Sequence, residues 1–108
     1  MPTVCRLTVY KVSEVDVIGC VLCTFTDVNE PCYLALDSKG LGLVADTDND
    51  RILLLSSELQ LQRVLIDRNS WQLKRPKRLC YNELTSQLFV AHSSIESWPD
   101  VISLFTLR

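Results

Sequence analysis

The chain has 108 residues, of which 47% are hydrophobic and 22% charged, with only 3 glycines and 4 prolines. This composition predicts one small globular domain and excludes a disordered segment. The formal net charge of −2 excludes a domain that is strongly basic as a whole, as many nucleic-acid-binding domains are.

Charge is distributed unevenly along the chain. Six acidic residues and one lysine lie between Asp27 and Asp50, whereas six basic residues and one aspartate lie between Arg63 and Arg78. An acidic segment is therefore followed by a basic one.

Apolar runs and cysteine content indicate where in the cell the protein is expected. No apolar run approaches the roughly 18 residues of a membrane span, and residues 1–6 lack the basic and apolar regions of a signal peptide. The five cysteines are Cys5, Cys20, Cys23, Cys32 and Cys80. An odd number of cysteines without an export signal predicts reduced thiols and a cytoplasmic location, with no membrane contact.

The start of the chain is expected to form two strands, over residues 5–12 and 20–26. Residues 6–10 resemble residues 51–55, and Cys20-Val21-Leu22 resembles Arg63-Val64-Leu65. This part therefore matches the second half of the unit that follows it.

Cys20 and Cys23 have the spacing of half a structural zinc site. Such a site needs four ligands, usually in two close pairs, and Cys32 and Cys80 form no second pair. Residues three apart on a strand also point to opposite faces. We therefore expect these two cysteines to be buried, unreactive thiols, and we expect no metal site.

The central unit is expected to contain four short strands, over residues 32–37, 42–46, 51–56 and 61–66. Ile52–Leu55 is apolar on both faces, as a strand must be when neighbouring sheets cover both of its sides. Leu59–Leu65 alternates at first, which is typical of a half-exposed outer strand. An amphipathic helix over Leu53–Leu65 is the alternative, but Ser56 and Ser57 interrupt its apolar face.

Polar residues and a glycine predict the turns of the central unit. Asp37 and Gly40 occupy the first and fourth positions of a type I turn. The loop from Asp46 to Arg51 is crowded with short polar residues that bond the local backbone. Its alternating aspartates imitate the start of a calcium loop, but the sixth and twelfth positions are Arg51 and Ser57 instead of Gly and Glu, so an EF-hand is excluded.

The third unit repeats the second. Pro31 recurs as Pro76 after 45 residues, Leu43–Asp46 as Phe89–His92 after 46, and Asp50–Leu55 as Asp100–Phe105 after 50. Its strands are expected at residues 77–82, 87–92 and 101–107. Periods of about 40–45 residues with four short strands are typical of the blades of a β-propeller.

Two further features of this region are candidate sites. His92 is the single histidine and is followed by Ser93 and Ser94, but neighbours on one strand end diverge, so we expect a loop-edge histidine and no catalytic pair. A basic segment connects the second and third units, and its candidate partner-binding residues are Trp71, Lys74, Arg75, Lys77 and Arg78. Three interpretations stay open: a solvated loop that anchors blade packing, a surface for an acidic protein, and a surface for RNA.

The central unit resembles the NHL repeat. The matching residues are Pro31, Asp37, Gly40, Asp46, Asn49, Arg51 and Ile52. The resemblance implies an all-β fold, a partial β-propeller of about two blades. It divides the chain into the tail of a first blade (1–30), a complete repeat (31–75) and a degenerate third unit (76–108). In the signature loop we expect Asn49 to shape the turn and Arg51 to bond a carboxylate such as Asp46.

The resemblance also carries a functional expectation. NHL domains bind partners, many of them in tripartite-motif ubiquitin ligases behind a RING and a B-box, and neither zinc module is visible in this sequence. A non-enzymatic protein-interaction or substrate-recruitment module without cofactor is therefore expected. The alternative is an RNA-binding face formed by Lys74, Arg75, Lys77 and Arg78. Because such domains usually close into rings of blades, this chain resembles a fragment, and open blade faces are expected to drive self-association.

Overall fold

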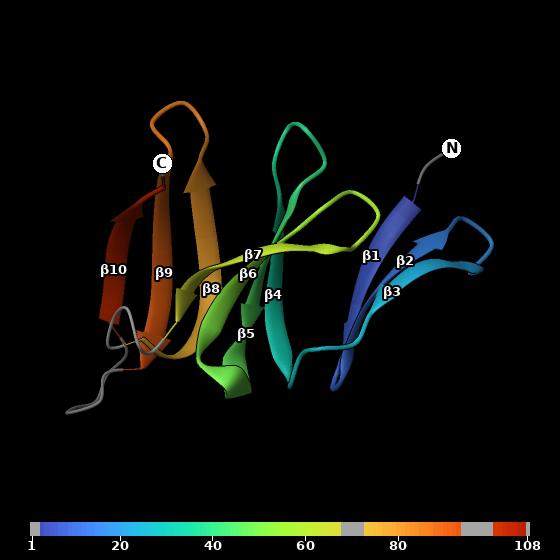
Figure 1. The fold of residues 1–108 in the computed structure, drawn as a ribbon, viewed down its shortest axis with the longest axis horizontal. Coiled ribbons are helices and arrows are strands. Elements are labelled where there is room, and N and C mark those ends of the chain that lie inside the picture. The colour runs from blue at the N-terminus through green and yellow to red at the C-terminus, as the bar shows by residue number, and fades with distance from the viewer. Residues whose placement is uncertain (1–2, 68–72, 94–100, 108) are drawn as a thin grey trace.

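The computed structural model describes residues 3–67, 73–93 and 101–107, which form β-strands and one short 3-10 helix (Figure 1). The strands are β1 (Thr3–Thr8), β2 (Lys11–Asp16), β3 (Val21–Phe25), β4 (Pro31–Leu36), β5 (Gly42–Asp46), β6 (Arg51–Leu55), β7 (Leu61–Asp67), β8 (Lys74–Asn82), β9 (Gln87–Ser93) and β10 (Val101–Thr106). The 3-10 helix η1 spans Thr47–Asn49. In this part of the chain, no helix has the length and apolar character that crossing a membrane requires.

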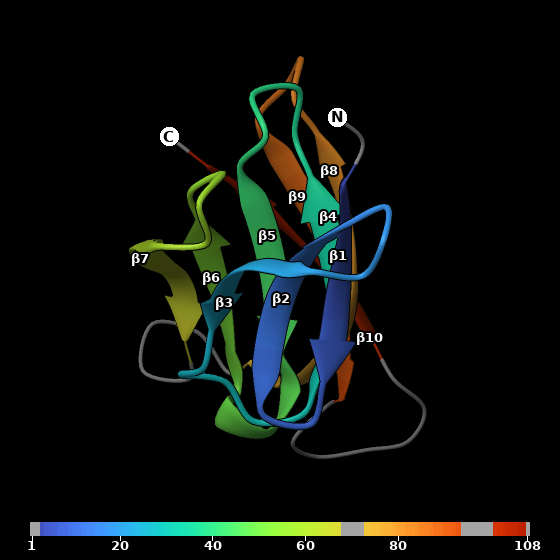
Figure 2. The same ribbon diagram turned by 90° about the vertical axis from the view of Figure 1, so that its right-hand side faces the viewer.

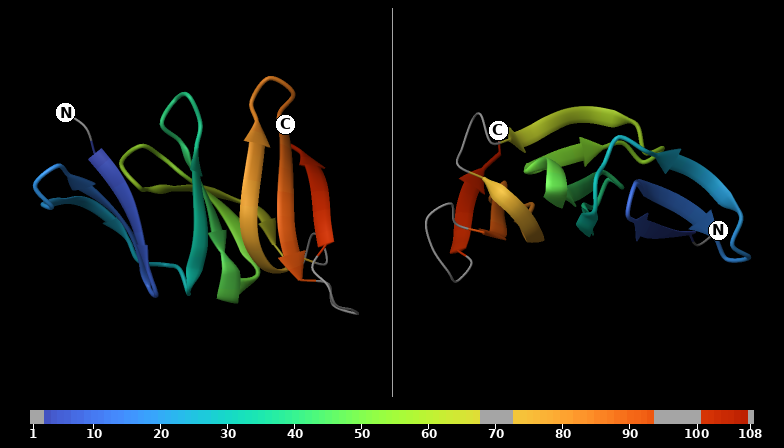
Figure 3. Two further views of the ribbon diagram at one scale, coloured as in Figure 1. Left: turned by 180° about the vertical axis from the view of Figure 1, so that it is seen from behind. Right: turned by 90° about the horizontal axis from the view of Figure 1, so that it is seen from below.

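The strands form three antiparallel sheets, which confirms the all-β prediction. The first sheet has the order β1-β2-β3, the middle sheet β4-β5-β6-β7 and the third sheet β10-β9-β8. The sheets stand side by side in chain order along the longest axis of the molecule (Figures 1 and 3). This arrangement agrees with a partial β-propeller, and the number of blades stays a prediction.

The middle sheet is covered on both faces, as its apolar strands predicted. Leu43, Ala45 and Ile52 belong to a buried cluster shared with the third sheet. The alternate residues Val44 and Leu53 belong to a second cluster shared with the first sheet. Because side chains alternate along a strand, β5 and β6 supply both clusters at once and hold the three sheets together.

The third sheet has the register that the sequence repeat predicted. Val44 lies opposite Leu53 in the middle sheet, and Val90 lies opposite Ser103 in the third. These pairs are related by the predicted shifts of 46 and 50 residues. The two sheets are therefore built on one repeating pattern of strand pairs.

The prediction for the start of the chain was wrong. Residues 5–12 form no single strand, because the chain turns at Val9 and Tyr10 between β1 and β2 (Figure 2). Val12 lies opposite Leu7 as Ile52 lies opposite Ala45, so β2 corresponds to β6. Apolar turn residues carry no local turn signal, which is why the turn was missed.

The predicted match between the outer strands of the first and second units is also displaced along the sequence. Val21 lies opposite Val15 as Leu61 lies opposite Leu55. Val21 therefore corresponds to Leu61, and the predicted match of Cys20-Val21-Leu22 with Arg63-Val64-Leu65 is wrong by register. Strands β6 and β7 also exclude the alternative helix over Leu53–Leu65.

One local prediction needs correction. The basic segment after Leu73 does not lie in a connection, because β8 already begins at Lys74. In the loop between β5 and β6, Asp50 adopts the left-handed conformation, with φ 54°. The predicted turn after β4 is confirmed, since Gly40 N–H donates to the Asp37 carbonyl over 3.1 Å.

The burial of the middle sheet can be tested at one cross-strand pair. Leu55→Ala is expected to lower the free energy of unfolding by about 2–5 kcal/mol, because it leaves a cavity between the first and middle sheets. Its cross-strand neighbour Leu61 is 42% exposed, so Leu61→Ala is expected to lower the free energy of unfolding by less than about 1 kcal/mol. Urea denaturation followed by circular dichroism measures both changes, and equal losses would contradict the packing described.

Candidate functional site

The signature loop between β5 and β6 is organised by one buried carboxylate. The Asp46 side chain is fully buried and accepts hydrogen bonds from the backbone N–H of Asn29 (2.7 Å), from Asn49 Nδ2 (2.9 Å) and from Arg51 Nε (2.7 Å). The predicted pairing of Arg51 with Asp46 is confirmed. These donors replace the water that the carboxylate loses on burial.

The same loop holds the linker between β3 and β4. Arg51 Nη2 donates to the Asp27 carbonyl over 2.6 Å and lies 3.5 Å from the Asp27 carboxylate. The backbone N–H of Asp48 donates to the Asn29 carbonyl over 3.0 Å. The linker that leads from the first sheet to the middle sheet is therefore held by polar contacts, in addition to the apolar packing between the two sheets.

On its other side the loop binds the beginning of β8. Thr47 Oγ1 donates to the Pro76 carbonyl over 2.7 Å, and the backbone N–H of Arg75 donates to Asp50 Oδ1 over 2.8 Å. Residues 46–51 therefore contact the linker between β3 and β4, the middle sheet and the third sheet. Their side chains are positioned for structure, which is the role that we expected for Asp46, Asn49 and Arg51.

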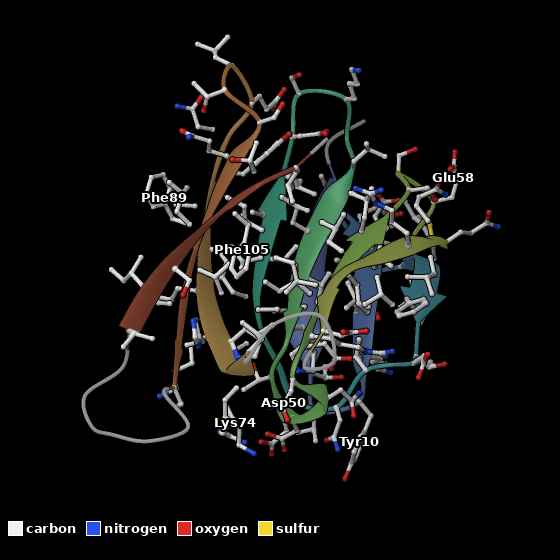
Figure 4. The ribbon with its side chains drawn as sticks, turned by 60° about the vertical axis from the view of Figure 1, so that its left-hand side comes forward. Tyr10, Asp50, Glu58, Lys74, Phe89 and Phe105 are labelled. Atoms are coloured by element: carbon white, nitrogen blue, oxygen red, sulfur yellow. The ribbon has the colours of Figure 1, made fainter. Side chains whose placement is uncertain are left out.

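The acidic loop also pairs with half of the basic segment. Lys74 Nζ lies 4.0 Å from Asp50 Oδ2 (Figure 4), and the Arg75 guanidinium forms an ion pair with the Asp48 carboxylate. Arg75 has a positive φ of 46° and lies at the register shift in the pairing of β8 with β9, near the start of β8. The opposite charges noted in the two segments of the sequence thus meet within the molecule.

A hollow of about 320 Å³ opens beside this ion pair, between β4 and β8. Its lining residues are Cys32, Tyr33, Thr47, Arg75, Lys77 and Arg78. Three of them are cations and none is an acid, and Arg78 is exposed. We name this hollow the basic hollow. Of the five candidate partner-binding residues, it brings together three.

Of the remaining two candidate residues, the structure places one elsewhere and does not describe the other. Lys74 is at the β8 terminus beside Asp50, and Trp71 lies outside the described residues. The interpretation that Trp71 stacks on a base or caps a peptide therefore stays a prediction.

A second, mainly apolar hollow was not predicted from the sequence. It has a volume of about 170 Å³ and is lined by Asp37, Leu41, Leu43, Leu54, Arg63, Leu65, Tyr81 and Leu107. Beside it, Glu83 joins the turns of two sheets, since its carboxylate accepts hydrogen bonds from the backbone N–H and the hydroxyl of Ser38. Because its walls come from residues far apart in sequence, no local pattern could have indicated it.

His92 is not at a loop edge, and that prediction was wrong. It lies within β9, is 5% exposed, and corresponds to the buried Asp46 of the middle sheet. Its Nε2 lies 2.8 Å from Ser103 Oγ, and its Nδ1 lies 2.9 Å from the Ser93 carbonyl oxygen. The imidazole therefore bridges β9 and β10, and it lines neither of the two hollows described above.

The prediction for the first cysteine pair was also wrong in part. Cys20 lies exposed in the turn before β3, whereas Cys23 lies half-buried on β3 with its Sγ 3.4 Å from Glu14 Oε1. Cys32 and Cys80 are exposed as well. Within the described ranges, no group of three or more Cys, His, Asp or Glu side chains has the geometry of a metal site.

The importance of the buried carboxylate can be measured. Asp46→Asn keeps the shape of the side chain but removes the charge that Arg51 faces, so the free energy of unfolding is expected to fall by about 3 kcal/mol. The control is Asp48→Asn, whose ion pair with Arg75 lies at the surface and is expected to contribute less than about 1 kcal/mol. Comparable losses in urea denaturation would contradict a central role for Asp46.

The thiols are expected to differ in reactivity. Burial, with a smaller contribution from the Glu14 carboxylate, raises the pKa of Cys5 and of Cys23 above its usual value. A raised pKa leaves less thiolate at pH 8, so iodoacetamide is expected to modify these two more slowly than the three exposed thiols. Mass spectrometry of partly alkylated protein measures the order. Glu14→Gln is expected to speed the alkylation of Cys23 without changing that of Cys80.

Comparison with known proteins adds no relative. No protein-family model matches this chain, and none of the curated proteins matches its sequence. The likeness of residues 31–66 to the NHL repeat therefore rests on its motif residues alone.

Proposed function

We propose that this chain is a non-enzymatic binding module whose basic hollow takes an acidic segment of a partner protein. The observation that carries the proposal is the lining of that hollow. Arg75, Lys77 and Arg78 converge there against Tyr33, and no acidic side chain lines it. Carboxylates pair with guanidinium groups through directed, charge-assisted hydrogen bonds, so an acidic peptide fits this chemistry.

The hollow is supported by rigid elements. Tyr33 lies on β4 and Arg78 on β8, both within paired strands. Thr47, one of the lining residues, donates to the Pro76 carbonyl and so connects the loop of one sheet to the strand of the next. Binding groups that are held before the ligand arrives lose little conformational entropy on binding.

Ion pairing inside the molecule favours a protein partner over RNA. Asp50 lies beside Lys74 and Asp48 pairs with Arg75, so two of the four cations expected at an RNA face already contact acidic groups. Asp48 and Asp50 would also repel a phosphate backbone close to these two cations. An acidic side chain from a peptide needs only a local contact, and Arg78 is exposed at the hollow.

The resemblance to the NHL repeat supports the same proposal, since domains of that kind bind partners. In this view the chain is a recruitment module, and a ubiquitin-ligase context is part of the proposal. The non-enzymatic part is supported by His92, whose imidazole is engaged between β9 and β10 and lies away from the basic hollow.

The proposal is tested with a fluorescein-labelled hexaglutamate peptide and fluorescence anisotropy. Arg78→Ala is expected to raise Kd about tenfold, because it removes a charge-assisted contact of roughly 1.5 kcal/mol. The matched control is Arg63→Ala, an exposed strand arginine that lines the other hollow. It is expected to leave Kd unchanged.

Three outcomes would overturn the proposal. The wild-type chain fails to bind the peptide, the two variants weaken binding equally, or an oligouridylate of matched length binds more tightly than the peptide. In the last case the slope of log K against log salt counts the phosphate contacts, at about −0.7 for each contact with a single strand.

A further inference from the structure

The two ends of the row of sheets differ in polarity. At one end, the third sheet turns a face away from the middle sheet, and we name it the outer face. On it Cys80 lies opposite Phe89, Phe89 lies opposite Leu104, and Ala91 lies opposite Ile102. Phe89 is 40% exposed, Leu104 50% and Ile102 74%. This is a contiguous apolar surface on three strands.

The orientation of this face follows from strand alternation. Leu88, Val90 and Phe105 point the other way and are buried in the cluster shared with the middle sheet. Figure 4 shows Phe105 directed toward the middle sheet and Phe89 directed away from it. The exposed residues therefore belong to a single face, and they are not scattered surface positions.

The outer face repeats a face that is already an interface inside the molecule. By strand register, Phe89 corresponds to Leu43, Ile102 to Ile52 and Leu104 to Leu54. Leu43 is 3% exposed and Ile52 is fully buried, and the third sheet covers them both. The outer face therefore has the residue types that pack against another sheet, at the positions that do so in the middle sheet.

The opposite end of the molecule is built differently. On the far face of the first sheet, Arg6, Ser13 and Thr24 form one cross-strand row. In the middle sheet the corresponding row is apolar: Val44, Leu53 and Val64. Arg6 and Thr24 are exposed, whereas Ser13 between them is 4% exposed, so the exposed positions of this row are polar.

We propose that two copies of this chain pack through their outer faces as a two-fold symmetric dimer. A second copy offers two sheet faces at its ends, the far face of the first sheet and the apolar outer face. The exposed Arg6 and Thr24 of the far face do not suit an apolar surface, because their side chains would lose water without gaining partners. The outer face of the second copy matches in chemistry, and a face that pairs with itself generates a closed, isologous dimer.

The driving force is the removal of exposed apolar surface from water. Phe89, Leu104 and Ile102 expose large side chains in the single chain, and each gains on burial in proportion to its apolar area. Arg78, opposite Ala91, marks the polar rim of the face. Arg78 also lines the basic hollow, but Leu104 and Ile102 do not, so variants at these two positions test the dimer separately from peptide binding.

The test is the molar mass of the chain in solution, measured by sedimentation equilibrium with a reductant to prevent disulfides between the free thiols. The wild-type chain is expected at twice its mass of 12.3 kDa. Leu104→Glu puts a charge into the outer face and is expected to give 12.3 kDa. Leu22→Glu is the matched control, because Leu22 is 53% exposed on β3, the edge strand at the other end, and the dimer is expected to persist.

The outcomes separate the possibilities. Ile102→Glu repeats the test at a more exposed position, and circular dichroism shows that each variant keeps its strands. A wild-type monomer at all concentrations would overturn the proposal. So would a dimer that survives both outer-face variants, which would indicate pairing through strand edges, or a dimer that Leu22→Glu dissociates.

Discussion

The fold depends on the buried carboxylate of Asp46. A carboxylate that is removed from water is tolerated only with full compensation, and Asn29, Asn49 and Arg51 provide it. These donors come from the linker before β4, from η1 and from β6, so satisfying one charge fixes the relative positions of three segments. The neighbouring residue Thr47 extends the same arrangement to β8. Apolar packing alone would allow the sheets to slide, whereas directed hydrogen bonds specify one arrangement.

Charge pairing around this loop also determines what the surface can offer a partner. The acidic and basic segments are separated along the chain, yet Asp48 and Asp50 lie against Arg75 and Lys74. Arg75, Lys77 and Arg78 line the basic hollow between β4 and β8. The basic segment is therefore paired with acidic groups at its start, and three of its cations meet at one hollow. This arrangement supports recognition of a compact acidic group in preference to an extended polyanion.

Much of the central unit could be predicted because its signals are local. The strand β5 begins and ends as predicted, the turn after Asp37 forms, and Arg51 pairs with Asp46. The failures occurred where local signals are weak. Val9 and Tyr10 turn the chain without a turn residue, and His92 is drawn into a strand because the repeat places it at a buried position. The mainly apolar hollow could not be predicted, since its walls come from segments up to seventy residues apart.

The amino-acid sequence by itself determined the fold class, the repeat and the register of the third sheet, because alternation and spacing depend only on neighbours along the chain. The tertiary structure decided which charges pair, which cations line the basic hollow, and which end of the molecule is apolar. These properties depend on distances between segments that no spacing in the sequence encodes. The contrast between Arg6 at one end and Phe89 at the other has meaning only once both are placed on outward faces.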